Sequence, residues 1–206
     1  MRYFSAIATV LLLVSGLPAE VKLPSLFSDN MVIQQDVSWR IWGKAKAGES
    51  VTVSVRGQTQ TVSAGADGKW VATMAPLKAG EPFEIVVSAG NTVTIRNVLA
   101  GEVWLASGQS NMAMPVSRSN DSEKEKAAAH YPALRMFRVG RGMAPAPADD
   151  VQGSWEICTP ETAGNFSAAG YFFARELIRT HKMAVGVIDA SIGGKRIQYF
   201  MHPDLA

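Results

Sequence analysis

The chain has 206 residues, of which 47% are hydrophobic and 18% are charged, and its formal net charge is +2. This composition is typical of a globular protein and argues against disorder. Lysine and arginine are scattered along the chain, so the basic stripe that neutralises phosphates is missing and no nucleic-acid partner is expected.

The first 19 residues, MRYFSAIATVLLLVSGLPA, have the pattern of a secretory signal peptide. Arg2 precedes an apolar run from Tyr3 to Val14, and small residues and Pro18 follow it. The run is too short to cross a hydrocarbon core of about 30 Å, and no longer apolar segment follows it. We therefore expect residues 1–19 to be a signal peptide, no membrane span, and a secreted or periplasmic protein; a buried N-terminal helix is the alternative.

Residues 20–100 are expected to form an antiparallel β-sandwich domain. Short runs that alternate apolar and polar residues are separated by turn sequences such as G-Q, A-D-G and A-G-N. In SVTVSV (50–55) the valines are expected to face a core and the hydroxyl residues to face solvent. Trp39, Trp42 and Trp70 are expected in that core, although aromatic rings on an exposed β-face can also stack on sugars.

After Gly101 the pattern changes to that of an α/β domain over residues 101–206. EVWLAS (102–107), ALRMFRV (133–139) and AVGVIDAS (184–191) are short apolar runs typical of parallel strands. FSAAGYFFARELIRTHK (166–182) predicts a helix, and residues 141–153 predict an extended surface loop. Strand, helix and strand in this order indicate a βαβ unit with a parallel sheet. With about three strands, the strand ending at Asp189 is expected to be an uncovered apolar edge, and the domain looks incomplete.

The predicted helix has a recognisable start and an apolar stripe. Ser167 is expected to cap it, with Phe166 packing on Tyr171. Phe173, Leu177 and Ile178 are expected to form its buried stripe.

Cys158 is the single cysteine, so it cannot form an intramolecular disulfide, and a buried small side chain is expected there. The three histidines stand far apart and lack neighbouring ligand-type residues. We therefore expect neither a metal nor a cofactor.

Two of the predicted parallel strands end in glycine- and serine-containing loops, S-G-Q-S-N and A-S-I-G-G-K. Ligands bind outside the carboxyl ends of the strands in open α/β sheets, so Ser110 is a candidate nucleophile there. The pattern G-x-S-x-G fails because Met112 replaces the second glycine. From spacing alone, a helix N-cap at Ser110 and a simple turn at Gly193 and Gly194 are the favoured alternatives.

A family resemblance changes that balance. EVWLASGQSNMAMPV resembles the nucleophile block of the sialate O-acetylesterases and related carbohydrate acetylesterases of the SGNH hydrolase superfamily. LFSDNMVIQQD and the run WGKAKAGESVTV resemble that family's N-terminal β-domain, FSAAGYFFARELI its helix, and VGVIDASIGGKRIQYFM its second conserved block. The resemblance implies an α/β fold: a β-sandwich domain followed by an incomplete SGNH-type domain with a parallel sheet.

The resemblance also implies roles for particular residues. Ser110 corresponds to the nucleophile, and its own N–H would be one oxyanion donor. Gly193 and Gly194 correspond to the glycine pair that completes part of the oxyanion hole, without showing which of them donates. Gln109 and Asn111 flank the serine and are expected to support its loop or bind substrate.

Two positions depart from the family pattern. Lys195 and Arg196 stand where the family has a small hydroxyl residue and a proline. Two cations there would favour an acidic sugar or would simply be solvated.

The catalytic base of the family is not found in this sequence. The family carries its histidine in a D-x-x-H-P element, whereas His202 and Pro203 are preceded by Tyr199 at the acidic position. His130 and His181 are better explained structurally. We therefore expect the chain to be the N-terminal part of a longer esterase.

Three functions remain open from the sequence. The first is a secreted carbohydrate O-acetylesterase acting on an O-acetylated carbohydrate. The second is a noncatalytic or decayed relative that binds sugars through the β-domain. A peptidase or lipase is a more distant third.

Overall fold

The computed structural model describes residues 20–140, 142 and 148–201. The expected signal peptide and His202 lie outside these residues. Within the described part of the chain, no helix is long and apolar enough to cross a membrane.

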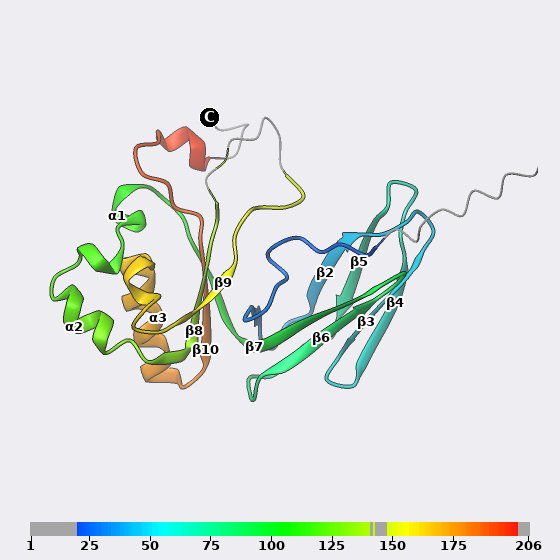
Figure 1. Cartoon of the computed structure of the whole chain (residues 1–206), viewed down its shortest axis with the longest axis horizontal. Coiled ribbons are helices and arrows are strands. Elements are labelled where there is room, and N and C mark those ends of the chain that lie inside the picture. Colours follow the sequence, from blue (N-terminus) through cyan, green and yellow to red (C-terminus); the bar gives the residue numbers. More distant parts are fainter. Residues whose placement is uncertain (1–19, 141, 143–147, 202–206) are drawn as a thin grey trace, which may run out of the picture.

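Two sheets form a β-sandwich in the first half of the chain, drawn at the right of Figure 1. One sheet pairs β2 (Trp39–Lys44) with β5 (Lys69–Met74) in antiparallel fashion. The other continues in the order β4 (Gln58–Ser63), β3 (Ser50–Val55), β6 (Phe83–Ser88) and β7 (Thr92–Ala106).

The core of the sandwich lies between these sheets. The three valines of β3 are at most 3% exposed, as the alternating pattern predicts. Trp39 and Trp70 are buried in the same cluster, which confirms their prediction. Trp42 is only partly buried, because it lies on the outer face of β2, where side chains alternate with the buried Ile41 and Gly43.

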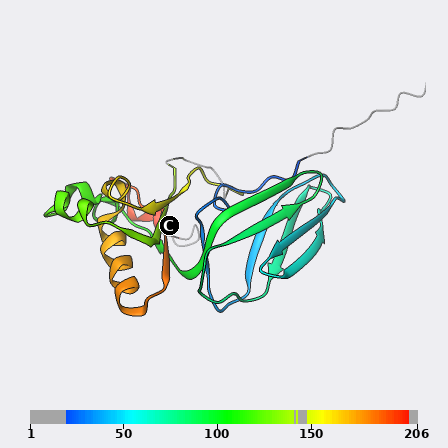
Figure 2. The ribbon, with the colours of Figure 1, turned by 60° about the horizontal axis from the view of Figure 1, so that its bottom comes forward.

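Strand β7 belongs to both halves of the molecule, as Figure 2 shows. Its first part pairs with β6, and its second part pairs in parallel with β1 (Val32–Gln34) and β10 (Ala184–Asp189). The expected boundary between residues 100 and 101 therefore falls inside one 15-residue strand. At Gly101 the neighbouring strand comes so close that a Cβ atom would overlap the carbonyl oxygen of Ala184.

The parallel strands are arranged in the order β7, β10, β8 (Tyr131–Arg138), with β9 (Trp155–Cys158) antiparallel to β8 at the edge. The α/β fold class is thus confirmed. The expectation that the strand ending at Asp189 is an uncovered edge is wrong: β10 lies between β7 and β8. Strand order does not follow chain order here, because the last strand of the chain inserts between two earlier ones.

Helix α3 (Ala168–His181) packs on β8 and β10, and Ser167 caps it by accepting the N–H of Gly170 at 3.1 Å. The predicted stripe is only partly right. Tyr171 and Ala174 form the buried centre, whereas Phe173 is 43% exposed and packs edge-on against Trp104. Phe173 lies two residues from Tyr171, about 200° around the helix, so it is not on the buried face and instead contacts Trp104 of β7.

The remaining helical segments are short. They are α1 (Ser110–Ala113), η1 (Val116–Arg118), α2 (Ser122–Ala127), η2 (Ala163–Asn165) and η3 (Ile197–Phe200). Cys158 is buried beneath α3, as expected for an unpaired cysteine.

Candidate active site at the carboxyl ends of the parallel strands

The loops that follow β7 and β10 lie side by side at the carboxyl ends of the parallel strands. The N–H of Ala190 donates to the carbonyl of Ala106, and the N–H of Ile192 donates to the carbonyl of Gly108, each at 2.9 Å. These bonds extend the pairing of the two strands into their loops. Backbone hydrogen bonds therefore hold together the two loops that contain the candidate site residues.

Ser110 is the first residue of α1 and is exposed to solvent. The N-cap residue of α1 is Gln109, whose side chain makes no capping hydrogen bond. The alternative that Ser110 is an N-cap is therefore wrong. Because Ser110 begins its helix, its N–H has no acceptor within that helix. Gln109 and Asn111 flank the serine and are also exposed.

The glycine pair approaches the serine from the β10 side. A Cβ atom at Gly193 would lie 3.8 Å from both Cα and Oγ of Ser110. Gly194 has a φ of 75°, in the left-handed region that glycine adopts without strain. The structure therefore brings Gly193 against Ser110, while Gly194 turns the chain away.

Asp189 is a site residue that the sequence interpretation did not single out. It is 4% exposed, and its Oδ1 accepts the N–H of Ser191 at 3.0 Å together with the Ser191 hydroxyl. Its Oδ2 lies 3.7 Å from Nε of Arg138. The buried carboxylate thus holds Ser191 in the loop that follows β10, residues 190–194, here called the glycine loop. A carboxylate at the end of an otherwise apolar strand was the available signal, because buried charges require partners.

A polar cavity of about 450 Å³ lies beside α1, between the ends of β8 and β10. Its lining includes Ala113 of α1 together with Arg138, Asn165, Asp189 and Ser191. A sugar presents many hydroxyl groups, and this lining offers both donors and acceptors for them.

A second hollow of about 560 Å³ borders the glycine loop and is lined by Gly194, Lys195, Arg196, Gln198 and Tyr199. The Nζ of Lys195 lies 5.2 Å from the centre of the Tyr199 ring. The two cations that depart from the family pattern therefore lie next to the glycine pair.

No histidine in the described part of the chain stands near Ser110. His130 is exposed after α2, and His181 is the last residue of α3, which leads back to the start of β10 at the other end of the parallel sheet. These positions agree with the expectation that His130 and His181 have structural rather than catalytic roles.

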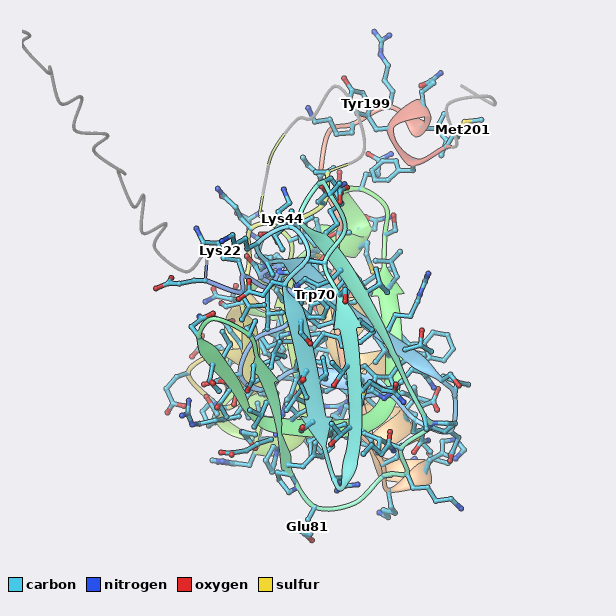
Figure 3. The ribbon with its side chains drawn as sticks, turned by 90° about the vertical axis from the view of Figure 1, so that its right-hand side faces the viewer. Lys22, Lys44, Trp70, Glu81, Tyr199 and Met201 are labelled. Carbon is cyan, nitrogen blue, oxygen red and sulfur yellow. The ribbon has the colours of Figure 1, made fainter. Side chains whose placement is uncertain are left out.

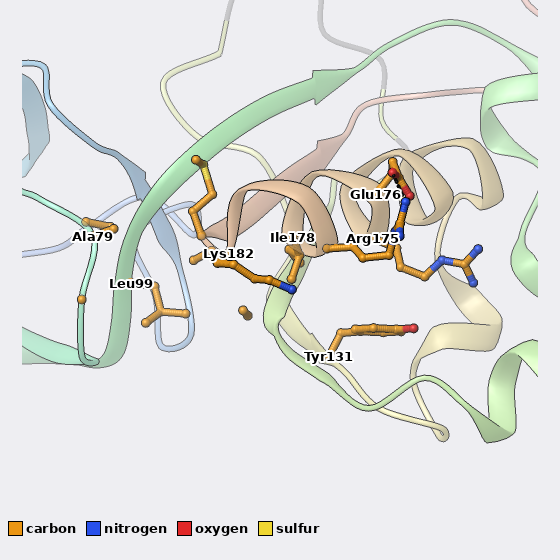
Figure 4. A pocket seen from close by; sticks show the side chains of 13 residues that line it. Ala79, Leu99, Tyr131, Arg175, Glu176, Ile178 and Lys182 are labelled. Atoms are coloured by element: carbon orange, nitrogen blue, oxygen red, sulfur yellow. Dashed lines mark hydrogen bonds and ion pairs between the residues drawn. The ribbon is translucent and has the colours of Figure 1, made fainter.

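A cavity of about 740 Å³ lies at that other end of the parallel sheet (Figure 4). Leu99, Ala133 and Ala184 line it from the strands, and Arg175 and Lys182 line it from the α3 side. Arg175 is paired with Glu125 at 2.5 Å. This cavity faces away from Ser110 because its strand residues precede the carboxyl ends.

Residues 100–205 match the family described as carbohydrate esterase, sialic acid-specific acetylesterase. The match covers just over half of the chain and contains Ser110 and the glycine pair. The chain belongs to this family. The resemblance seen in its sequence motifs is thereby confirmed.

Individual relatives agree with the family match. The sialate O-acetylesterase of Rattus norvegicus is 32% identical over 198 residues, which are 86% of this chain and 36% of the relative. The sialate O-acetylesterase of Homo sapiens is 31% identical over 199 residues, 86% of this chain and 38% of the relative. The chain thus spans little more than a third of the length of these curated relatives.

A solved structure agrees as well. The crystal structure of a carbohydrate acetylesterase from Xanthomonas citri superposes with a TM-score of 0.88 at 35% identity. The superposition covers 90% of this chain and 43% of that one.

Proposed function

We propose that the chain carries the nucleophile of a secreted carbohydrate O-acetylesterase and that Ser110 is this nucleophile. The observation that carries the proposal is the position of Ser110: exposed at the end of β7, with Gly193 against its Cα and Oγ. Membership of an acetylesterase family supports the same reaction class.

The proposed reaction is ester hydrolysis through an acetyl-serine. The hydroxyl oxygen of Ser110 attacks the acetyl carbonyl of an O-acetylated sugar, and a base takes the hydroxyl proton. The N–H groups of Ser110 and of the glycine loop stabilise the negative charge on the carbonyl oxygen. The sugar hydroxyl leaves with the proton, and water then releases acetate from the serine. We propose that a histidine outside the described residues supplies the base.

Kinetics with an activated ester test the nucleophile. With 4-nitrophenyl acetate, the protein purified from its native source is expected to release a burst of nitrophenol as Ser110 becomes acetylated. Ser110→Ala is expected to lose both the burst and the turnover, because the variant lacks the hydroxyl that becomes acetylated. Ser107→Ala, at an exposed serine of the same loop, is the matched control and is expected to keep both. Turnover retained in Ser110→Ala would end this proposal.

Secretion is proposed from residues 1–19 and is tested separately. The mature protein recovered outside the cytoplasm is expected to lack this segment and to begin close to Glu20. N-terminal sequencing measures this, and an exported protein that retains Met1 would contradict it.

A further inference from the structure

Three lysines stand in a row across adjacent strands of the β-sandwich. Lys22 pairs with Lys44 in an antiparallel bridge, through N–H···O=C bonds of 2.8 and 2.9 Å in the two directions. Lys44 in turn is directly opposite Lys69 in the register of β2 and β5. Residues directly opposite one another point to the same face of a sheet. Lys22, Lys44 and Lys69, here called the lysine row, therefore share one face of the sheet. Figure 3 labels Lys22 and Lys44, the bridged pair of this row.

The lysine row is only partly neutralised by the chain itself. Like charges directly opposite one another destabilise a sheet. Asp149 lies 2.9 Å from Nζ of Lys69 and 3.9 Å from Nζ of Lys44. Asp150 is also close, but its Oδ1 accepts the N–H groups of Ser25 and Val151 at 2.8 and 2.7 Å. Lys22 makes no ion pair within the described residues, so the row has an excess of positive charge at that end.

An aromatic surface adjoins the lysine row. Trp42 lies on the same face of β2 as Lys44, two residues earlier, and is partly exposed. Phe27 packs edge-on against it with ring centres 4.5 Å apart, which restricts the indole orientation. A groove of about 440 Å³ is lined by Trp42, the lysine row, Leu23, Pro24 and Val71, and also by Asp149 and Asp150. This volume is within the range of sites that hold small ligands.

We propose that this groove binds an acidic saccharide, with its carboxylate on Lys22 and Lys44 and a sugar ring against Trp42. A sugar ring has an apolar C–H face that packs on an aromatic ring, and a carboxylate forms charge-assisted hydrogen bonds with ammonium groups. The contact of Asp149 with Lys69 and Lys44 shows that the row accepts a carboxylate.

The groove is separate from the candidate active site. It is lined by residues of β2 and β5, with Lys22, Leu23, Pro24, Asp149 and Asp150. Helix α1, which begins at Ser110, lies in the other half of the molecule (Figure 1). Binding at the groove therefore goes beyond the proposed esterase and does not depend on Ser110 being a nucleophile. A site there would hold an acidic glycan to the protein while other parts of the glycan are processed.

Calorimetric titration with 3′-sialyllactose and with lactose tests the proposal, because the two ligands differ by one acidic sugar. The chain is expected to bind sialyllactose in a salt-dependent manner and to show no measurable heat with lactose. The double variant Lys22→Gln with Lys44→Gln is expected to bind about tenfold more weakly or worse, as charge-assisted bonds are lost. Lys46→Gln with Lys78→Gln removes two exposed lysines outside the groove and is the matched control.

Each contrary outcome has a definite meaning. Equal binding of lactose, or unchanged affinity in the groove variant, overturns the groove assignment. Sodium acetate that binds as tightly as sialyllactose overturns the role of the sugar ring. Ser110→Ala is expected to keep the affinity; a loss there, with none in the groove variant, would place the ligand at the candidate active site instead. The ligand carries no acetyl ester, so a failed esterase assay does not affect this result.

Discussion

At the scale of single residues, the approach of Gly193 to Ser110 can be tested without disturbing the fold. Gly193 is not among the residues with positive φ, and an added Cβ would lie at an ordinary contact distance of 3.8 Å from Ser110 Oγ. We expect Gly193→Ala to change the free energy of unfolding by less than about 0.5 kcal/mol, as is usual for exposed positions.

In the proposed mechanism the acetyl group approaches Ser110 Oγ, and the methyl group of Gly193→Ala would lie beside that atom. Ester hydrolysis by Gly193→Ala is therefore expected to fall on the order of tenfold or more, since small misplacements at a reacting centre are costly. Urea unfolding and 4-nitrophenyl acetate hydrolysis measure the two effects. Full activity in the stable variant would show that the glycine loop does not border the reacting group.

Two buried acids make the stability of the fold sensitive to alkaline pH. Burial raises the pKa of the Cys158 thiol from 9.0 to about 12, and burial raises the pKa of the Tyr171 hydroxyl from 10.0 to about 12. Between the ordinary pKa values of 9.0 and 10.0 and the folded-state value of about 12, the unfolded chain releases protons that the folded chain retains. Rising pH therefore favours the unfolded state over this range. The contribution is fully present below about pH 9 and is lost as the pH rises towards 12.

Urea midpoints measured from pH 8 to pH 11 test this dependence. They are expected to fall above about pH 9, and Cys158→Ala is expected to show a shallower fall because one of the two groups is gone. An identical slope in the variant would contradict the role of the thiol.

At the scale of elements, β7 depends on the absence of a side chain at Gly101. A Cβ there would overlap the carbonyl oxygen of Ala184, which belongs to the paired strand β10. Gly101→Ala is expected to lower the free energy of unfolding by about 1–3 kcal/mol, the usual cost of overpacking. Gly142→Ala, at an exposed glycine with no atom within 4 Å of the added Cβ, serves as the control. Equal unfolding midpoints of the two variants would contradict this prediction, because β7 and β10 would then accommodate the added methyl group at little cost in stability.

At the scale of the whole molecule, the second part of β7 has an exposed strand edge within the described residues. Within the described residues, β1 pairs with β7 only as far as Gly101, so the strand beyond it has a ladder to β10 on one side alone. Trp104 is 45% exposed and Leu105 66% exposed along this segment. An apolar strand edge of this kind promotes association with other chains.

We therefore expect the 206-residue chain to self-associate as its concentration rises. Leu105→Lys is expected to reduce this association, because a charged side chain on an edge opposes strand addition. Sedimentation velocity over a tenfold concentration range measures both, with Val71→Lys, an exposed valine of the other sheet, as the control. Equal association of all three proteins would exclude the β7 edge as the contact.

Local patterns in the sequence determined the secondary structure and the neighbourhood of the site. Alternation buried the valines of β3, Ser167 capped α3, and the apolar runs became β7, β8 and β10. Each of these features depends on residues close together in the chain, which periodicity and capping rules describe. The sequence also placed Ser110 and the glycine pair at strand ends, and their catalytic roles remain predictions.

Only the tertiary structure decided which segments meet. It inserted β10 between β7 and β8, left Phe173 half exposed beside Trp104, bonded Asp189 to Ser191, and aligned Lys22 with Lys44 and Lys69. The physical reason is that periodicity specifies which face of an element is buried, but not which other element covers it. That choice depends on the packing and hydrogen bonding of distant segments, which no short stretch of sequence contains.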